Sequence, residues 1–222
     1  MSNTRENLQK IYGQLPPHVR LIAVSKFKPD AAVLEAYCCG QKIFGENRVQ
    51  ELVGKYQRLP KDIEWHFIGH LQTNKVGLIV PFVSLIHSID SLRLLTAVDR
   101  EARKVGRQVP CLLQFHIAKE ATKFGFTFAE AVEMLQSPEY KELAAVKIVG
   151  VMGMATFSDD KALVRGEFKE LKRIFEALKA RFFADDSAFS ELSMGMSDDY
   201  PEALAEGSTM IRVGSLIFGA RN

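Results

Sequence analysis

Lys26 is the residue of this sequence whose type and position most clearly suggest covalent chemistry. It follows the apolar run Leu21–Val24 after a single serine, and Phe27 comes directly after it. Apolar surroundings disfavour a charged ammonium group, and a neutral amine can attack an aldehyde to form a Schiff base. A solvated lysine in a loop before a helix that begins near Pro29 is the alternative. Position alone does not separate these two interpretations.

Two segments rich in small residues near the C-terminus form a candidate phosphate site. They are Ser193–Ser197 and Arg212–Ser215, and a helix-like segment follows each. Small residues let backbone amides approach an anion, although they also make ordinary turns and helix caps. Taken with a candidate Schiff-base lysine, the two segments indicate a phosphorylated aldehyde. Pyridoxal phosphate fits this description, and so does the substrate of an aldolase.

The elements that must position these residues alternate along the whole chain. Eight short apolar, β-branched runs are separated by stretches whose apolar residues recur at helical spacing. The predicted strands are Arg20–Val24, Lys42–Phe44, Glu64–Ile68, Ser84–His87, Pro110–Ile117, Val146–Met152, Glu191–Met194 and Met210–Val213. The predicted helices are Asn3–Leu15, Asp30–Cys39, Arg48–Arg58, Leu92–Val105, Phe128–Gln136, Ala162–Phe182 and Asp199–Glu206.

This alternation predicts the α/β class, with parallel strands joined by crossover helices. Eight strands favour a closed (β/α)8 TIM barrel, and an open doubly wound sheet is the alternative. No low-complexity linker divides the chain, so residues 1–222 are expected to form one domain. The first helix is expected to cap the barrel or to pack beside it.

Polar residues and glycines follow the predicted strands, where a parallel barrel binds its ligands. Lys26 comes after the first strand and Asn47 after the second, while the two small-residue segments follow the last two strands. These residues are therefore expected to meet at the carboxyl edge of the barrel. The pattern supports a site there without naming its ligand.

Composition limits the partners and the compartment. The formal net charge of the 222 residues is +2 and the basic residues are dispersed, which gives little reason to expect a nucleic-acid partner. No apolar stretch approaches the roughly 20 residues of a membrane span. Three cysteines and a polar N-terminus favour a cytoplasmic protein. His66 alternates with Trp65 and Phe67 and is expected to pack, and we assign no metal site.

Four segments in order resemble the pyridoxal phosphate homeostasis protein family. They are AVSKFKP at 23–29, FGENRVQE at 44–51, WHFIGHLQTNK at 65–75, and SMGMSDDYPEALAEGSTMIRVGSLIFGAR at 193–221. The resemblance implies a fold-type III barrel that binds pyridoxal phosphate, similar to the N-terminal domain of alanine racemases and without their C-terminal β domain. It also implies a non-catalytic role in the supply of vitamin B6.

The resemblance also implies roles for individual residues. Lys26 matches the Schiff-base lysine of the family, and Arg212 matches the arginine that faces the pyridine nitrogen. The remaining residues match cofactor-binding positions: Ser193, Ser197, Gly214 and Ser215 at the phosphate end, and Asn47 in the FGEN motif. Phe27 and His70 depart from the residues that are usual in the family, and neither replaces a cofactor contact.

The residues beside the cofactor favour binding over turnover. Arg212 can donate a hydrogen bond to the ring nitrogen but does not supply a proton, so the ring would be a weak electron sink. In the related racemases a second domain of the partner subunit supplies the opposing acid or base. We therefore expect a protein that binds pyridoxal phosphate and has apo-enzymes or amino acids as its other partners. We expect it to be a monomer.

Three other functions remain as alternatives at this stage. A class I aldolase also combines a Schiff-base lysine with a phosphate site, but its lysine usually lies on a later strand. A compact amino-acid racemase would form D-amino acids. A non-enzymatic carrier or sensor of the cofactor is the third alternative. A carrier would transfer the cofactor to apo-enzymes faster than it releases the cofactor into solution.

Overall fold

The eight strands form a closed parallel barrel, as the sequence predicts. The computed structural model describes residues 3–118 and 125–219. Each strand pairs with the next, and β1 pairs with β8 to close the ring, which excludes the open doubly wound sheet. The strands are β1 Arg20–Val24, β2 Ile43–Glu46, β3 Glu64–Phe67, β4 Leu85–Ile89, β5 Val109–His116, β6 Val146–Met154, β7 Glu191–Ser193 and β8 Met210–Val213.

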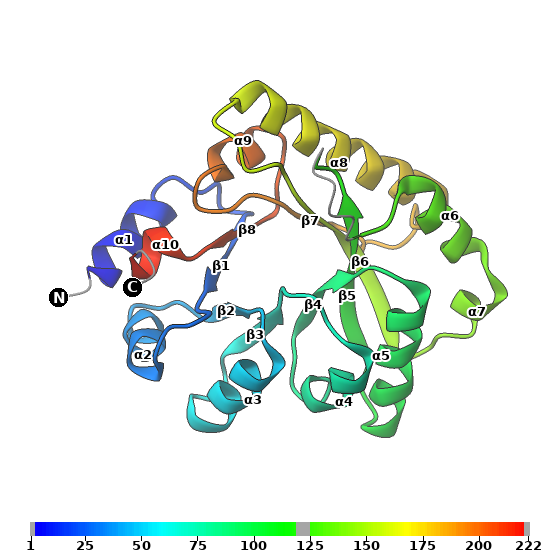
Figure 1. Ribbon diagram of the computed structural model, residues 1–222, viewed down its shortest axis with the longest axis horizontal. Coiled ribbons are helices and arrows are strands. Elements are labelled where there is room, and N and C mark those ends of the chain that lie inside the picture. Colours follow the sequence, from blue (N-terminus) through cyan, green and yellow to red (C-terminus); the bar gives the residue numbers. More distant parts are fainter. Residues whose placement is uncertain (1–2, 119–124, 220–222) are drawn as a thin grey trace.

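Helices surround the barrel and connect successive strands (Figure 1). The connections after β3 and β5 contain short helical segments that the sequence analysis did not predict. The helical segments are α1 Thr4–Tyr12, α2 Asp30–Cys38, α3 Val49–Arg58, η1 Thr73–Lys75, α4 Val76–Ile79, α5 Leu92–Lys104, α6 Phe128–Gln136, α7 Pro138–Lys141, α8 Lys161–Phe182, α9 Tyr200–Ala205 and α10 Ser215–Phe218.

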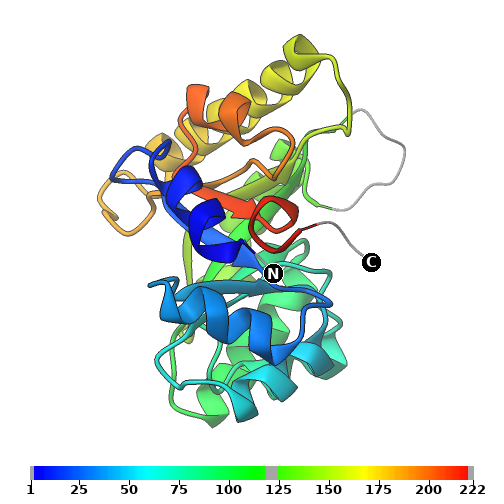
Figure 2. The same cartoon turned by 90° about the vertical axis from the view of Figure 1, so that its left-hand side faces the viewer.

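The first and last helices lie side by side at the outside of the barrel (Figure 2). The side-chain amide of Asn7 on α1 donates a hydrogen bond to the carbonyl oxygen of Ile217 on α10, at 3.1 Å. Helix α1 also contacts α2. The first helix therefore packs beside the barrel, which is one of the two expected placements, and it supports the segment that follows β8.

Alternating side chains of the strands divide the apolar core into two parts. On β1, Leu21 and Ala23 belong to the large cluster between the strands and the helices, whereas Ile22 points into the barrel. The interior cluster consists of Ile22, Leu85, Leu112, Met152 and Met210. Buried polar side chains of β3, β4, β7 and β8 include His66, His87, Ser193 and Arg212. The barrel interior thus contains an apolar cluster and, beside it, a group of buried polar side chains.

A bulge in β6 depends on one glycine. Gly150 has a φ of 157°, and a Cβ atom at this position would lie 1.9 Å from the carbonyl oxygen of Glu191. The register between β5 and β6 shifts between Cys111 and Leu112, next to this glycine. Only glycine tolerates both the backbone conformation and the close approach. The bulge precedes the ends of β5 and β6, which carry Gln114 and Met154 into the site described below.

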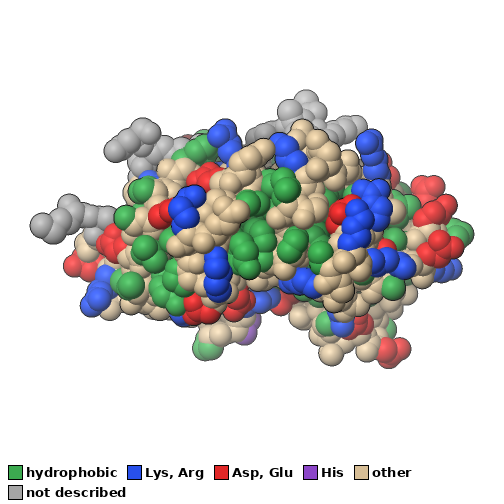
Figure 3. Space-filling model, turned by 90° about the horizontal axis from the view of Figure 1, so that it is seen from below, with side chains coloured by type: hydrophobic (Ala, Val, Ile, Leu, Met, Phe, Trp, Pro, Cys, Tyr) green, Lys and Arg blue, Asp and Glu red, His purple; other side chains and the backbone are tan. Residues whose placement is uncertain are grey.

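The surface carries charges of both signs. Figure 3 shows the face below the view of Figure 1, where basic and acidic side chains surround a central group of hydrophobic ones. Tyr56 of α3 stacks on Phe82 with ring centroids 3.8 Å apart, and Leu78 of α4 is 55% exposed. Within the described residues, no helix is long and apolar enough to cross a membrane.

Candidate functional site

A cavity of about 410 Å³ lies at the carboxyl edge of the barrel. Residues that follow or end β1, β2, β3, β5, β6, β7 and β8 line it, so the closed barrel brings together segments far apart in the sequence. The cavity contains six of the seven site residues that the sequence predicts: Lys26, Asn47, Ser197, Arg212, Gly214 and Ser215.

A larger and more open hollow of about 980 Å³ lies outside the barrel along α5. Arg93, Arg100 and Arg103 line it together with Glu139 and Glu142. It contains none of the predicted site residues. Chemical content rather than size therefore identifies the smaller cavity as the candidate site.

Lys26 reaches the cavity from a turn that ends β1. The amide of Lys28 donates a hydrogen bond to the carbonyl oxygen of Ser25 at 3.0 Å, which closes the four-residue turn Ser25–Lys28. Phe27, the third residue of this turn, has a φ of 63°. Lys26 itself is half-buried and lines the cavity. An amine here can meet an aldehyde held in the barrel mouth.

Arg212 enters the cavity from the interior of β8. Its Nη1 atom donates to the Oγ atom of Ser193 at 2.6 Å, and its Nη2 atom donates to the carbonyl oxygen of Gly153 at 3.0 Å. Burial lowers the pKa of the Arg212 guanidinium to about 10, although the carboxylate of Asp199 acts in the opposite direction. The group is therefore still charged at neutral pH. It is a fixed hydrogen-bond donor on one side of the cavity.

A hydrogen-bonded chain continues from Arg212 through the barrel. The Nδ1 atom of His87 lies 3.0 Å from the Oγ atom of Ser193, and the Nε2 atom of His87 lies 3.0 Å from the Nδ1 atom of His66. Arginine only donates, so the Ser193 hydroxyl accepts from Arg212, and Nδ1 of His87 is an acceptor within reach of its own proton. In that arrangement His87 carries its proton on Nε2 and donates it to Nδ1 of His66.

Burial keeps both histidines of this chain neutral. It lowers the pKa of His66 to about 3, and the positive charge of Arg20 contributes in the same direction. It also lowers the pKa of His87 well below its ordinary value, with contributions from His66, Arg212 and Arg20. Two neutral imidazoles can share one proton in the contact between them, whereas two charged ones, which have no acceptor, cannot. His66 is packed in the barrel interior, as the sequence analysis expected.

The predicted phosphate end is divided by the structure. Ser197, Gly214 and Ser215 line the cavity, and the Gly214 amide donates to the Oγ atom of Ser197 at 3.3 Å. Ser193 is fully buried, binds Arg212 and His87, and is not among the cavity-lining residues. Its position differs from that of the other three because Ser193 belongs to β7, whereas Ser197 lies in the loop beyond the strand.

Asn47 supplies a test of whether a ligand fits the cavity. It lines the cavity, and its Oδ1 atom is buried without a hydrogen-bond partner among the described residues. Buried polar atoms are normally satisfied, so an orphaned acceptor that borders a cavity indicates a missing donor. A polar aromatic molecule with a hydroxyl group, such as pyridoxal phosphate, supplies such a donor. The residues present therefore fit this cofactor.

Two other residues of the mouth were not among the predicted cofactor-binding residues. Lys28 lines the cavity, and its ammonium group donates to the carbonyl oxygens of Phe218 at 3.1 Å and Gly219 at 3.2 Å. The Nδ1 atom of His70, another lining residue, lies 3.3 Å from a carboxylate oxygen of Asp90. Position after a strand is the signal that could have identified both residues. The described residues contain no cluster of three or more potential metal ligands.

Comparisons with known proteins define the class of this site. The family model of the alanine racemase N-terminal domain matches residues 1–222. The chain is 39% identical to the pyridoxal phosphate homeostasis protein of Synechocystis sp. over 214 residues, which are 96% of each chain. It is 36% identical to the Escherichia coli K12 protein of the same name, over 95% of this chain and 89% of that one. The chain thus belongs to the alanine racemase N-terminal domain family and, within it, to the pyridoxal phosphate homeostasis proteins.

Solved structures agree with this assignment. PipY of Synechococcus elongatus PCC7942, with pyridoxal phosphate bound, is 40% identical and superposes with a TM-score of 0.88, over 98% of this chain and 100% of PipY. The form without the cofactor superposes with a TM-score of 0.91. An alanine racemase of Clostridium difficile 630 is 15% identical, with a TM-score of 0.77 over 99% of this chain and 60% of the racemase. That likeness concerns the fold alone.

Proposed function

We propose that this chain binds pyridoxal phosphate through a Schiff base on Lys26 and acts in the homeostasis of this cofactor. The observation that carries the proposal is the single cavity in which Lys26, Arg212, Asn47 and Ser197 meet. The homologous proteins named for pyridoxal phosphate homeostasis, and PipY with the cofactor bound, support it. When bound, pyridoxal phosphate supplies an aldehyde and an electron-withdrawing ring.

Each residue of the cavity has a distinct part in holding this cofactor. Lys26 provides the amine for the covalent bond. Arg212 holds the ring nitrogen by a hydrogen bond, and Asn47 accepts from the ring hydroxyl. Ser197, Gly214 and Ser215 surround the phosphate group. Ser193 acts behind Arg212, because its hydroxyl accepts from the guanidinium and also lies within hydrogen-bond distance of His87.

The geometry around Arg212 favours binding over turnover. Its pKa of about 10 and its two fixed acceptors keep the guanidinium protonated at neutral pH. A protonated arginine donates a hydrogen bond to the ring nitrogen without releasing its proton, so the ring withdraws electrons weakly. We therefore expect racemisation of amino acids close to the uncatalysed rate. Accumulation of D-amino acids that depends on Lys26 would instead support the racemase alternative.

The cellular setting is part of the same proposal. Cys38, Cys39 and Cys111 are all unpaired, which favours a reducing compartment such as the cytoplasm. We infer a monomer that releases pyridoxal phosphate to apo-enzymes. Loading of an apo-enzyme from this protein should then be faster than the release of pyridoxal phosphate into buffer. Equal rates would indicate storage rather than delivery.

The direct experiment is an absorbance spectrum followed by borohydride reduction and peptide mapping. Wild-type protein with pyridoxal phosphate should show an imine band at about 420 nm. After borohydride reduction it should carry a stable adduct on Lys26. Lys26→Ala should lose both. Mapping must separate Lys26 from Lys28, since both side chains line the cavity. Trapping of a sugar phosphate, without trapping of pyridoxal phosphate, would favour the aldolase and contradict the proposal.

A further inference from the structure

We propose that Lys55 and Glu51 of α3, with Glu46 at the end of β2, are positioning residues for Lys26. They clamp the turn that carries this lysine and so fix where its amine enters the cavity. The inference rests on the proposed function, because it concerns the geometry with which Lys26 meets pyridoxal phosphate. None of the three residues is among those that line the cavity.

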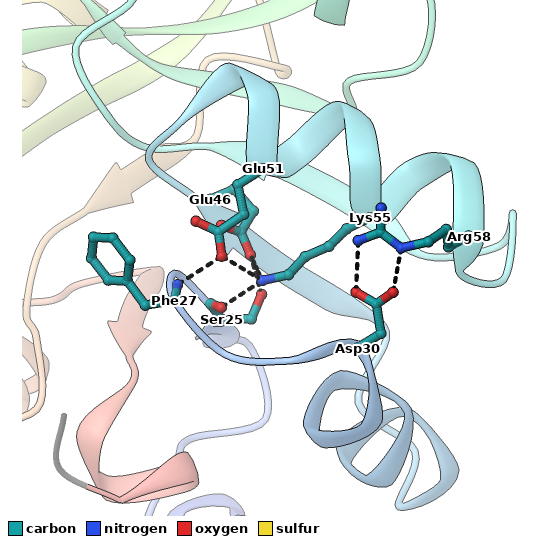
Figure 4. A network of polar contacts seen from close by, with 7 residues as sticks. All are labelled: Ser25, Phe27, Asp30, Glu46, Glu51, Lys55 and Arg58. Carbon is teal, nitrogen blue, oxygen red and sulfur yellow. Dashed lines mark hydrogen bonds and ion pairs between the residues drawn. The ribbon is translucent and has the colours of Figure 1, made fainter. Parts of the chain in front are cut away.

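The clamp is built around the ammonium group of Lys55 (Figure 4). This group donates to the carbonyl oxygen of Ser25 at 2.7 Å, to Oε1 of Glu46 at 2.7 Å and to Oε1 of Glu51 at 2.9 Å. An ammonium group has three donors, and each has an acceptor here. Lys55 is only 2% exposed, although lysine is rarely buried. Its place is therefore determined by these contacts.

The contacts hold the turn on both sides of Lys26. On one side, Lys55 binds the carbonyl oxygen of Ser25, and the Ser25 hydroxyl donates to Oε1 of Glu46 at 2.6 Å. On the other side, the amide of Phe27 donates to Oε1 of Glu51 at 2.7 Å. Lys26 thus lies between two backbone groups that are tied to the same cluster. Its backbone cannot shift without breaking charged hydrogen bonds.

The conformation of the turn explains why such a clamp is needed. Phe27 has a φ of 63°, in the left-handed region that an aromatic residue rarely adopts. Phe27 is 49% exposed, so burial of its ring does not account for this conformation. A strained backbone persists when surrounding contacts determine it, and such residues gather at functional sites. The carboxylate of Glu51 is the contact that holds the Phe27 amide.

A purely stabilising role is a weaker explanation of the buried charges. Glu46 is fully buried, and its Oε2 atom has no hydrogen-bond partner among the described residues. Burial raises the pKa of the Glu46 carboxyl, while Lys55 and Ser25 act against this. Buried ion pairs contribute little net stability compared with apolar side chains of similar size. A function in positioning accounts for their presence beside the reactive lysine.

The same helix offers a matched control. Arg58, one turn beyond Lys55, binds the carboxylate of Asp30 through its Nε atom and through Nη2 at 3.0 Å (Figure 4). This pair ties α3 to α2, and the Arg58 side chain is 59% exposed. The hydrogen bonds of Arg58 within the described residues go to Asp30 and not to the turn Ser25–Lys28. Arg58→Met therefore removes an ion pair of α3 and leaves every hydrogen bond of the clamp in place.

The test compares Glu51→Ala, Glu51→Gln, Lys55→Met and Arg58→Met with the wild type. Hydrogen exchange of the Phe27 amide measures the clamp without the cofactor. The rate of imine formation with pyridoxal phosphate measures its effect on Lys26. Glu51→Ala should speed this exchange and slow imine formation, each by about tenfold, as expected for one lost hydrogen bond to a charged group. Glu51→Gln retains an acceptor and should restore most of both values.

Each outcome decides the matter. Lys55→Met should act in the same direction as Glu51→Ala. If Lys55→Met does not fold, Glu51→Ala decides alone, because the Glu51 side chain is partly exposed and its removal disturbs the core less. Wild-type rates of imine formation in Glu51→Ala, or an equal loss in Arg58→Met, would overturn the clamp. No imine in the wild type would instead count against the proposed function. The exchange of the Phe27 amide would then still decide whether the clamp holds the turn.

Discussion

The Nη1 atom of Arg212 donates to the Oγ atom of Ser193 at 2.6 Å, and this contact determines what Ser193 can do. The same hydroxyl lies 3.0 Å from Nδ1 of His87. Ser193 is fully buried and does not line the cavity, so it does not face a phosphate group held there. Ser193 therefore supports the guanidinium, whereas Ser197 lies in the cavity wall.

Ser193→Ala and Ser197→Ala should weaken cofactor binding in different ways. Ser193→Ala acts through Arg212, so binding of pyridoxal phosphate and of pyridoxal should weaken by a similar factor. Ser197→Ala removes a phosphate contact and should weaken pyridoxal phosphate alone, by about tenfold. Spectroscopic titration of both ligands measures these effects. A loss in Ser193→Ala that is confined to pyridoxal phosphate would return Ser193 to the phosphate end.

The two variants should also differ in stability. Ser193→Ala leaves Arg212 Nη1 and His87 Nδ1 without their buried partner, which costs about 1–3 kcal/mol of unfolding free energy. Ser197 is only half-buried, and its loss should cost less than about 1 kcal/mol. Urea unfolding of the cofactor-free proteins measures both values. Equal stabilities would contradict the chain of hydrogen bonds behind Arg212.

The buried histidines predict how stability depends on pH. Both have folded pKa values below the ordinary value, about 3 for His66, so the unfolded chain binds their protons first as the pH falls. The free energy of unfolding should therefore decrease below about pH 6.5, by about 1.4 kcal/mol per pH unit for each histidine. For His66 the decrease continues down to its folded pKa. Above pH 7 neither histidine should make the free energy of unfolding depend on pH.

His66→Leu isolates the contribution of one histidine. Carboxylates contribute to the slope in both proteins, so the difference between the two curves reports the lost imidazole. The variant should reduce the slope between pH 4 and 6 by about 1.4 kcal/mol per pH unit. It should also be less stable at pH 7, because Nε2 of His87 loses its buried hydrogen-bond partner. Parallel curves would mean that the pKa of His66 is the same in the folded and unfolded protein, which contradicts its lowered value.

The sequence predicted the barrel because hydrophobic periodicity is local. The apolar run Leu21–Val24 ends at a polar serine, and β1 has the predicted bounds Arg20–Val24. Prediction was less accurate where strands carry buried polar groups. β4 was expected to end at His87 but continues through Ser88 to Ile89, all buried. A polar residue in the barrel interior looks like the end of a strand until its partners are known.

Sequence position located the cavity-lining residues that follow a strand, such as Lys26 and Asn47. Arg212 lies within β8, and its role was predicted from the family resemblance instead. Lys55 was missed because its role depends on Ser25, which lies 30 residues away. With Glu51 four residues before it on a helix, Lys55 resembles an ordinary exposed ion pair. Two features distinguish Lys55 from such a pair: it is buried, and it binds the carbonyl oxygen of Ser25. Both arise only in the folded chain.

The left-handed residue Phe27 predicts a difference between two substitutions. Asparagine tolerates a φ of 63°, whereas a β-branched residue does not. Phe27→Ile should therefore be less stable than Phe27→Asn by about 1–2 kcal/mol. Both variants lose the contact between the Phe27 ring and Arg48, at 4.6 Å, so this term cancels in the comparison. Thermal or urea unfolding measures the difference.

Imine formation provides a second measurement on the same pair. Phe27→Asn keeps the backbone amide that Glu51 binds and should form the imine at close to the wild-type rate. Phe27→Ile should be slower if the turn opens to relieve the strain. Equal stabilities of the two variants would show that Phe27 leaves the left-handed region in solution.

Gly69 predicts a link between backbone packing and the cofactor site. A Cβ atom at Gly69 would lie 2.3 Å from the carbonyl oxygen of Asn47 and 2.7 Å from its Cα atom. Both neighbours are backbone atoms, so Gly69→Ala must separate the ends of β2 and β3. We expect a loss of about 1–3 kcal/mol of unfolding free energy. Displacement of Asn47 should also weaken pyridoxal phosphate binding.

Gly166→Ala is the matched control for this substitution. Gly166 lies on the exposed face of α8, away from both ends of the helix, and a Cβ atom there would meet nothing within 4 Å. The same change should therefore stabilise the protein by about 0.5–1 kcal/mol, the helix preference of alanine over glycine. Opposite signs for the two variants in urea unfolding, with weaker cofactor binding in Gly69→Ala alone, are the expected result. If Gly69→Ala binds pyridoxal phosphate normally, the position of Asn47 does not control the site.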